Sequence, residues 1–282
     1  MGKTPSGMGR LYRIKNMKCE DMSYKDITFD VRDNGIATMT LNRPDALNSF
    51  TRNMFAEWTD VIDHCAFNDK VRVLVITGNG RAFSSGVDLS ALGHDKPSPQ
   101  FRYYYRQAHQ SFDNLEALEI PVIAAINGLC YGGGIELALS CDILIGAADS
   151  TYCLVENQLG AIPASGACNR MIYYVGLAKT KELVLRAKPI DAQEAWRIGL
   201  LNDVAPADEL LDRAYAMAEE LVQNAPLAMG IGKHVINLCL NTDMHTGRSL
   251  ERLGQSVLQY SDDFNEGLNA FFEKRKPKFT GR

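Results

Sequence analysis

The stretch most suggestive of chemistry runs from an apolar segment at 121–126 through three glycines at 132–134 to Glu136. The pattern predicts a buried strand followed at once by a helix. Unpaired N–H groups at a helix N-terminus attract negative charge, and glycines let a ligand oxygen approach the backbone. Glu136 falls in the first turn of this helix, where its carboxylate either takes part in chemistry or only complements the helix dipole.

A second Gly-rich turn, at 78–89, follows another apolar run. A free amide near Val87 is a candidate partner for the amide of Gly133. Two converging N–H donors form an oxyanion hole, and each donor contributes about 3 kcal/mol to transition-state stabilisation. Such a pair suits a thioester oxygen as it becomes an enolate. We expect Asp88 in the same turn to cap a helix.

Motifs of several other enzyme classes are missing from the sequence. It contains no HExxH, GxSxG, GxxxxGK[ST] or GxGxxG pattern, and its five histidines lack metal-ligand spacing. Ser84 and Ser85 have no motif-placed base, so we interpret them as turn residues. Zinc chemistry, triad hydrolysis and dinucleotide binding are therefore disfavoured, and no metal site is predicted.

The elements that must position these residues can be predicted from periodicity. Alternating residues at 27–32 and 36–41 predict a β-hairpin, and apolar residues at helical spacing predict a helix at 51–67. Continuous Val, Ile and Ala runs predict parallel strands buried on both faces, at 71–77, 122–126 and 143–147. The middle of the chain therefore predicts repeated strand–strand–helix units in an α/β fold.

The chain divides into three parts by composition. Residues 1–23 are predicted to be a disordered extension, although Met1 to Ser6 also fits the N-myristoylation pattern. Residues 24–206 form the predicted α/β core. Residues 207–282 are predicted to be helical, with helices at 208–223, 226–240, 248–260 and 263–274. The segment 93–106, which contains Pro97 and Pro99, is predicted to be a loop.

The composition and charge of the chain argue against further classes of protein. The 282 residues include 30 Lys and Arg against 34 Asp and Glu, and this net charge of −4 argues against nucleic-acid binding. The apolar stretch at 120–131 is too short to cross a bilayer, so no membrane span is expected. Seven cysteines without a CxxC pair predict reduced, buried thiols in a cytoplasmic protein.

Several of these motifs, in order along the chain, resemble those of the crotonase (enoyl-CoA hydratase/isomerase) superfamily. The resemblance covers the chain from about residue 27. It rests on Leu-Asn-Arg-Pro-Asp-Ala-Leu-Asn at 41–48, Ser-Gly-Val-Asp-Leu at 85–89, Ala-Ala-Ile-Asn-Gly at 124–128, Gly-Gly-Gly-Ile-Glu-Leu-Ala at 132–138, Cys-Asp-Ile at 141–143, Leu-Gly at 159–160 and Phe-Phe-Glu-Lys-Arg-Lys-Pro at 271–277.

The resemblance implies a crotonase-like spiral of ββα turns with a C-terminal helical segment that assembles trimers, often paired as hexamers. It implies an acyl-CoA substrate, no separate cofactor, and oxyanion-hole amides at Val87 and Gly133. The CoA moiety is expected along Ala46, Ser85, Val87, Asp88 and Leu89. Phe271 and Lys274 match positions that reach a CoA, often in a neighbouring subunit; alternatively, Lys274 belongs to a solvated basic tail.

Two glutamates perform hydration in this family, and both are matched, by Glu136 and Glu156. Paired carboxylates can hold one water between them, one accepting its proton while the other supplies a proton to the α-carbon. The resemblance therefore implies hydration of a 2-enoyl-CoA to a 3-hydroxyacyl-CoA. Double-bond isomerisation of an enoyl- or dienoyl-CoA is the alternative, and a non-catalytic crotonase-like binding protein is a third.

The sequence departs from the family in two places and has one individual feature. Val155 stands where proline often precedes the second glutamate, and Ala164 opens a stretch that is usually rich in glycine. The methyl group of Ala164 is expected to crowd the site or to reshape the acyl pocket. Aromatic residues gather at 101–105, where they either favour an aromatic or cyclic acyl group or serve only in packing.

Overall fold

The computed structural model describes residues 22–91 and 98–282, and it begins with the predicted hairpin. Strands β1 (Ile27–Val31) and β2 (Ile36–Leu41) pair antiparallel, with Ile27 opposite Leu41. The turn between them requires glycine, because Gly35 has φ +85° and a Cβ there would lie 2.7 Å from the carbonyl oxygen of Lys70. The hairpin prediction is confirmed.

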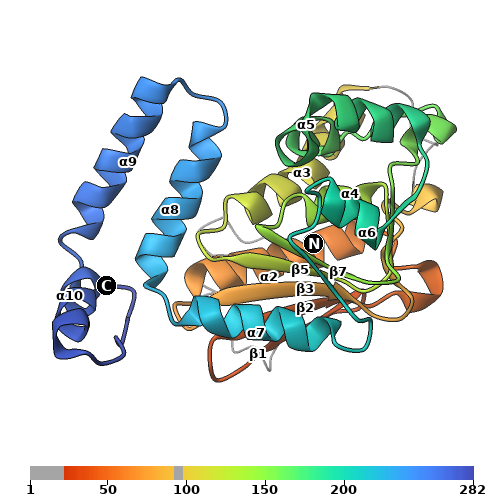
Figure 1. The fold of residues 1–282 in the computed structure, drawn as a ribbon. Helices are drawn as coiled ribbons and strands as arrows, with labels where there is room; N and C mark the ends of the chain where they lie inside the picture. The colour runs from red at the N-terminus through yellow and green to blue at the C-terminus, as the bar shows by residue number, and fades with distance from the viewer. Residues whose placement is uncertain (1–21, 92–97) are drawn as a thin grey trace, which may run out of the picture.

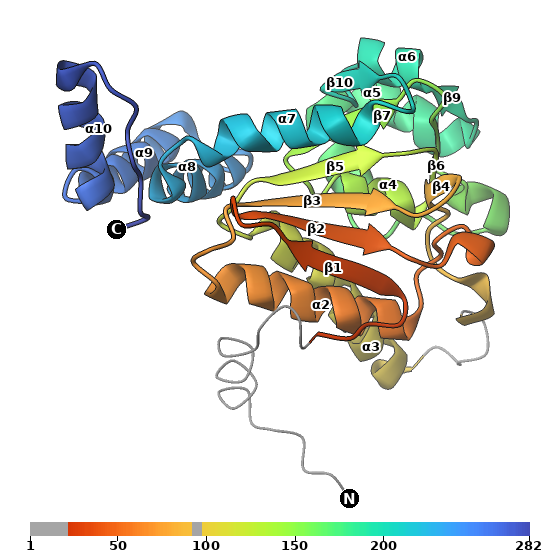
Figure 2. The same ribbon diagram turned by 90° about the horizontal axis from the view of Figure 1, so that it is seen from below.

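The hairpin forms one edge of a six-stranded sheet with the order β1-β2-β3-β5-β7-β10 (Figure 2). From β2 onward all neighbours are parallel, and the three predicted buried strands are confirmed. The strands that follow the hairpin in this sheet are β3 (Val73–Gly78), β5 (Val122–Ile126), β7 (Ile143–Ala147) and β10 (Asp203–Ala205). Their continuous apolar sequences fit burial on both faces.

A smaller sheet is built from short strands that follow the long ones. Its order is β4-β6-β8-β9, formed by β4 (Ala82–Ser84), β6 (Leu129–Tyr131), β8 (Thr151–Cys153) and β9 (Ile190–Asp191). A helix follows each of the first three, namely α3 (Pro99–Glu116), α4 (Gly133–Ala138) and α5 (Ala167–Arg186). The chain thus winds through the predicted strand–strand–helix turns.

Helices cover both faces of the main sheet (Figure 2). On one face α2 (Arg52–Phe67) packs with α3, where the ring of Trp58 lies 5.1 Å from that of Phe112. On the other face lies α7 (Leu210–Val222), whose Leu210, Ala214 and Ala218 join a second apolar cluster. Thr51 caps α2 by accepting from the Met54 amide, which explains why the predicted helix begins there.

The C-terminal part is helical, as predicted, and extends away from the sheets (Figure 1). After α6 (Ala192–Arg197) and α7, it contains α8 (Pro226–Cys239), α9 (Met244–Leu258) and α10 (Asp262–Glu273). Helix α9 begins four residues earlier than predicted, because Asp243 caps it by accepting from the amides of His245 and Thr246. Large apolar side chains remain exposed on this segment, among them Ile236, Leu253, Val257, Phe271 and Phe272.

Two further expectations need correction. The loop predicted over 93–106 ends earlier, because helix α3 begins at Pro99, and proline is well suited to the first helical position. Cys168 is exposed and Cys239 is half-buried, contrary to the prediction of buried thiols, whereas Cys65, Cys130, Cys141 and Cys153 are buried. Residues 1–21, with Cys19 and the myristoylation pattern, and residues 92–97, with Pro97, lie outside the described residues. Within the described ranges, none of the helices is both long and apolar enough to span a membrane.

Candidate active site

Glu136 and Glu156 are brought together at the Gly-rich start of α4. Gly132 has φ +51°, its amide donates to the carbonyl oxygen of Cys153 at 2.8 Å, and a Cβ on it would lie 2.9 Å from Oε1 of Glu156. The positive φ favours glycine at position 132, and its lack of a side chain leaves room for the Glu156 carboxyl group. The two predicted catalytic carboxyl groups therefore face one small region, although 20 positions separate them in the sequence.

The Glu136 side chain is buried and held by backbone amides. Its residue is 3% exposed, and Oε1 accepts hydrogen bonds from Ser165 at 2.6 Å and from Ala167 at 3.3 Å. Burial raises the pKa of Glu136 to about 7, the two amides oppose this shift, and the nearby charge of Glu156 adds to it. This carboxyl group therefore exchanges a proton near neutral pH.

Glu156 opens the short 3₁₀ helix η4 (Glu156–Leu159) directly after β8. Burial raises the pKa of its carboxyl group as well. Its Oε2 atom is buried and has no hydrogen-bond partner among the described residues. An acceptor left without a partner in this way is costly unless it serves a ligand, water or proton.

The amides of Val87 and Gly133 lie next to each other. A Cβ built on Gly133 would lie 3.4 Å from the Val87 nitrogen, and one on Gly86 would lie 2.7 Å from the Gly133 nitrogen. In the hydrogen bonds of the described residues, neither amide acts as a donor. The geometry thus leaves two neighbouring N–H groups unused at the N-terminus of α4, as an oxyanion hole requires.

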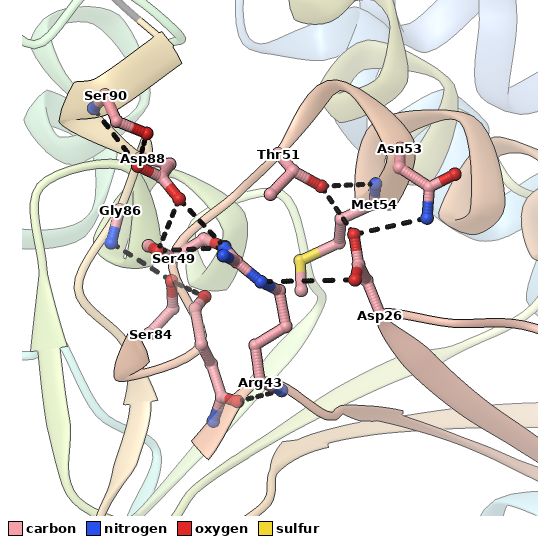
Figure 3. A network of polar contacts seen from close by, with 11 residues as sticks. Asp26, Arg43, Ser49, Thr51, Asn53, Met54, Ser84, Gly86, Asp88 and Ser90 are labelled. Carbon is pink, nitrogen blue, oxygen red and sulfur yellow. Dashed lines mark hydrogen bonds and ion pairs between the residues drawn. The ribbon is translucent and has the colours of Figure 1, made fainter. Parts of the chain in front are cut away.

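A polar network fixes the turn that carries Val87 (Figure 3). Asp88 accepts from the amide and hydroxyl of Ser90 at 3.1 and 2.6 Å, and from Nη1 of Arg43 at 3.1 Å. The Ser90 hydroxyl and the Arg43 guanidinium lower the pKa of Asp88. Asp88 thus caps the short helix η3 (Leu89–Ala91), as expected, but its ion pair with Arg43 was missed.

Arg43 also approaches Asp26 at 4.0 Å, and Ser84 supports the same turn by accepting from the Gly86 amide at 3.0 Å. Ser84 is the last residue of strand β4 and is buried, so it stands at the edge of the turn that it supports and not within it as predicted. Arg43 lies within the 41–48 motif, where it is the single cationic residue, and this is the signal in the sequence that points to it.

The positions proposed along the CoA moiety lie on two adjacent segments. Ala46 ends the short helix η2 (Pro44–Ala46), and the amide of Ser85 donates to the carbonyl oxygen of Leu47 at 2.9 Å. Val87 pairs in parallel with Phe50, and Leu89 is exposed. Ala46, Ser85, Val87, Asp88 and Leu89 are therefore brought together beside the unused amides.

Phe271 and Lys274 are not brought to this site within one chain. Both belong to the end of α10, at the far end of the C-terminal segment from α4 (Figures 1 and 2). Phe271 is 78% exposed. A role at a CoA held by a neighbouring subunit stays a prediction.

Tyr105 on α3 completes the surroundings of the two glutamates. Burial raises the pKa of its phenol, and the charges of Glu136 and Glu156 raise it further, so the phenol lies close enough to sense both carboxyl groups. Its ring lies 4.3 Å from that of His109, one helical turn away. Tyr103 in the same aromatic cluster is exposed instead. In the part of the chain that the structure describes, no three His, Cys, Asp or Glu side chains gather as a metal site.

Comparisons with known proteins show which family the chain resembles. Residues 31–282 match the sequence profile of the enoyl-CoA hydratase/isomerase family. The chain is 32% identical over 251 residues to the 2,3-dehydroadipyl-CoA hydratase of Escherichia coli (strain K12), covering 89% of this chain and 97% of that protein. It is 35% identical over 242 residues to the short-chain-enoyl-CoA hydratase of Clostridium acetobutylicum, and the match covers 86% of this chain and 92% of that protein.

Among solved structures, the enoyl-CoA hydratase from Bacillus anthracis superimposes with a TM-score of 0.87 at 33% sequence identity. The match covers 92% of this chain and 100% of that one. The crotonase-like α/β fold with its C-terminal helices is therefore the fold of this chain.

Proposed function

The chain belongs to the enoyl-CoA hydratase/isomerase family, and from this we propose that it adds water to a 2-enoyl-CoA to give a 3-hydroxyacyl-CoA. The observation that carries the proposal is the convergence of Glu136 and Glu156. Both carboxyl groups have raised pKa values, and Glu136 lies on the helix whose first residue, Gly133, has its amide next to that of Val87.

In the proposed reaction, the thioester carbonyl oxygen accepts hydrogen bonds from Val87 and Gly133. Negative charge builds up on this oxygen as water attacks the β-carbon, so two fixed donors stabilise the transition state more than the ground state. Each such donor contributes about 3 kcal/mol. The Gly-rich turns serve to bring these two donors within reach of one oxygen.

The glutamate pair handles the protons. Burial raises the pKa of Glu136 to about 7, with a further contribution from the charge of Glu156, so this carboxyl group can carry a proton near neutral pH while Glu156 is proposed to be ionised. The ionised carboxylate takes a proton from the water whose oxygen bonds to the β-carbon, and the protonated carboxylic acid gives its proton to the α-carbon. Water is thereby added across the double bond, and the pair again holds one proton.

For substrate binding, the CoA moiety is proposed to lie along Ala46, Ser85, Val87, Asp88 and Leu89. Lys274 and Phe271 are proposed to contact a CoA bound to a neighbouring subunit of a trimer or hexamer. The exposed apolar side chains of α8 to α10 support such an assembly, because single chains rarely leave so many large apolar groups in water. The acyl group is proposed to meet Tyr105.

The test is turnover of a panel of straight-chain, branched, aromatic and cyclic 2-enoyl-CoAs, followed by loss of enoyl-thioester absorbance. Glu136→Gln and Glu156→Gln are each expected to lower kcat by about 10²- to 10⁴-fold. Glu251→Gln, on the exposed surface of α9, serves as the control. Unchanged rates in both site variants would refute the proposal.

Solvent labelled with oxygen-18 separates hydration from isomerisation, since only hydration incorporates the label. Turnover without incorporation would assign the chain to the isomerases of the family. Tight RNA binding without turnover of any acyl-CoA in the panel would instead indicate a non-catalytic binding protein.

A further inference from the structure

The loop that holds Glu136 is itself held by Arg170. The amide of Ser165 donates to Oε1 of Glu136 at 2.6 Å, while the carbonyl oxygen of Ser165 accepts from Nη1 of Arg170 at 3.0 Å. One residue thus connects the carboxylate to the guanidinium through its two backbone groups. Arg170 lies in α5, just beyond the loop, and its side chain is only 12% exposed.

Gly166 makes this arrangement possible. Its φ of +121° is a conformation that L side chains rarely adopt, and a Cβ there would overlap Nη1 of Arg170. The guanidinium therefore occupies the space in which a side chain at position 166 would lie. Loop and guanidinium fit each other only when residue 166 is glycine.

The other end of the Arg170 guanidinium is anchored to α3. Nε and Nη2 donate to the two oxygens of Glu116 at 3.0 and 2.8 Å, and Nη2 also donates to Asp113 at 2.8 Å. Burial lowers the pKa of Arg170, but the hydrogen bonds and charges of Glu116 and Asp113 outweigh it and raise the pKa overall. A planar guanidinium with fixed donors can satisfy these acceptors and the Ser165 carbonyl together.

We propose that Arg170 is a positioning residue: it fixes the Ser165–Ala167 loop against α3 and so aims the backbone N–H groups that hold the Glu136 carboxylate. The proposal deepens the proposed hydration and rests on it. Because α3 also carries Tyr105, Arg170 sets the distance between the helix at the proposed acyl site and the catalytic loop.

The charged and titratable groups around Glu136 define what the test must separate. Glu156 on η4, Tyr105 on α3 and Cys168 on α5 lie near Glu136, whereas His109, Asp113 and Glu116 lie near Arg170. A lost charge and a loosened loop both alter the Glu136 environment. Arg170→Lys distinguishes them, because lysine keeps the charge but cannot reproduce the fork that joins Ser165, Glu116 and Asp113.

The experiment compares Arg170→Met, Arg170→Lys and the control Arg197→Met, which removes an exposed arginine bonded to Glu194 on α6. The first readout is the carboxyl titration of Glu136 in protein labelled with carbon-13 glutamate, assigned by its loss in Glu136→Gln. When the Ser165 and Ala167 amides are held less firmly, they stabilise the ionised Glu136 carboxylate less. We therefore expect the Glu136 pKa to rise by about one unit in both Arg170 variants. This readout does not depend on turnover.

The second readout is the pH profile of kcat and KM for the best substrate of the panel. We expect kcat at neutral pH to fall about 10- to 100-fold in both Arg170 variants, with KM unchanged and the profile displaced upward. If Arg170→Lys shows the same Glu136 titration and the same pH profile as the wild type, then only the charge of residue 170 matters. That result would overturn the proposal. So would a Glu136 pKa that stays or falls in both variants.

Should Arg170→Met not fold, Arg170→Lys and Glu116→Gln carry the same test, since Glu116→Gln weakens the anchor while keeping Arg170. An inactive wild-type protein would refute the proposed hydration but leave the titration test in force. If the wild type is active and the pKa of Glu136 is unchanged in the Arg170 variants, the positioning role of Arg170 is refuted while the proposed hydration stands.

Discussion

The backbones of Gly86 and Gly133 pack so closely that a Cβ atom on Gly86 would lie 2.7 Å from the Gly133 nitrogen. Gly86 also has φ +89°, which disfavours any L side chain. This contact brings the first turn of α4 against the segment that follows β4, so that the amides of residues 87 and 133 lie next to each other. The proposed oxyanion hole depends on the absence of a side chain at position 86.

We therefore expect Gly86→Ala to separate the two amides. The clash and the strained φ should lower stability by about 1–3 kcal/mol, and misplaced donors should lower kcat by about 10²-fold or more. Denaturant unfolding and steady-state kinetics measure the two effects. Gly232→Ala in α8 is the matched control, because no atom lies within 4 Å of a Cβ there and helical alanine is favourable. Equal kinetics in the two variants would contradict the assignment of these amides.

Glu136 should make stability depend on pH. Its pKa is raised from 4.5 to about 7 in the folded chain, chiefly by burial, so its contribution is present below pH 4.5 and is lost as the pH rises through 7. Glu136→Gln cannot ionise and escapes this loss. Between pH 5 and pH 8, we expect the stability of Glu136→Gln relative to wild type to increase by about 2 kcal/mol. Stability is measured by denaturant unfolding at both pH values, with Glu251→Gln as the control. If the stability difference between Glu136→Gln and wild type is the same at pH 5 and pH 8, a raised pKa of Glu136 is ruled out.

Arg43 should support catalysis without touching the glutamates. It joins Asp88, at 3.1 Å, to Asp26, at 4.0 Å, and so fixes the turn that carries Val87. Removing it in Arg43→Met leaves Asp88 without its cation. We expect kcat/KM to fall about tenfold, corresponding to loss of about 1.4 kcal/mol, whereas Arg81→Met, exposed in the neighbouring turn, should have no effect. If Arg43→Met and Arg81→Met have identical kcat/KM values, Arg43 does not support this turn.

Tyr105 should influence which acyl group is accepted. Its half-buried ring packs on His109, and its phenol senses the charges of both glutamates, so we expect its replacement to open space near the proposed reaction centre. In Tyr105→Ala we expect the ratio of kcat/KM for bulky to short acyl chains to rise about tenfold. Tyr103→Ala, on the exposed face of the same helix, is the control. An unchanged ratio across the substrate panel would assign Tyr105 to packing alone.

Lys274 should act on CoA binding if a neighbouring subunit completes the site. It occupies the left-handed conformation at the end of α10, with φ +55°, which asparagine tolerates well. Lys274→Asn should therefore fold normally but raise KM for the thioester about tenfold through a lost phosphate contact, with kcat unchanged. Lys181→Gln on α5 is the control, and light scattering checks that the assembly is intact. An unaltered KM in an intact assembly would leave Lys274 in a solvated tail.

Local sequence determined most of the elements of this protein. The alternation at 27–32 and 36–41, the apolar runs at 122–126 and 143–147, and the glycines before Glu136 each produce an element within their own residues. The spacing of apolar residues within each segment fits one element type and the faces it buries, which is why pattern predicts the element although strands such as β5 pair with residues far away in the sequence. Glycine and proline mark turns in the same way, although Pro99 opened a helix where a loop was predicted, since proline suits both.

The tertiary structure alone decided which side chains meet. Ser165 bonds to Glu136 across 29 positions, Arg43 to Asp88 across 45, and Arg170 to Glu116 across 54. No local pattern encodes such pairs, because each depends on the register of two sheets and on how closely the glycine backbones approach. Burial has the same origin: the sequence places a glutamate at the start of a helix, but only the packed fold removes it from water and raises its pKa toward neutrality.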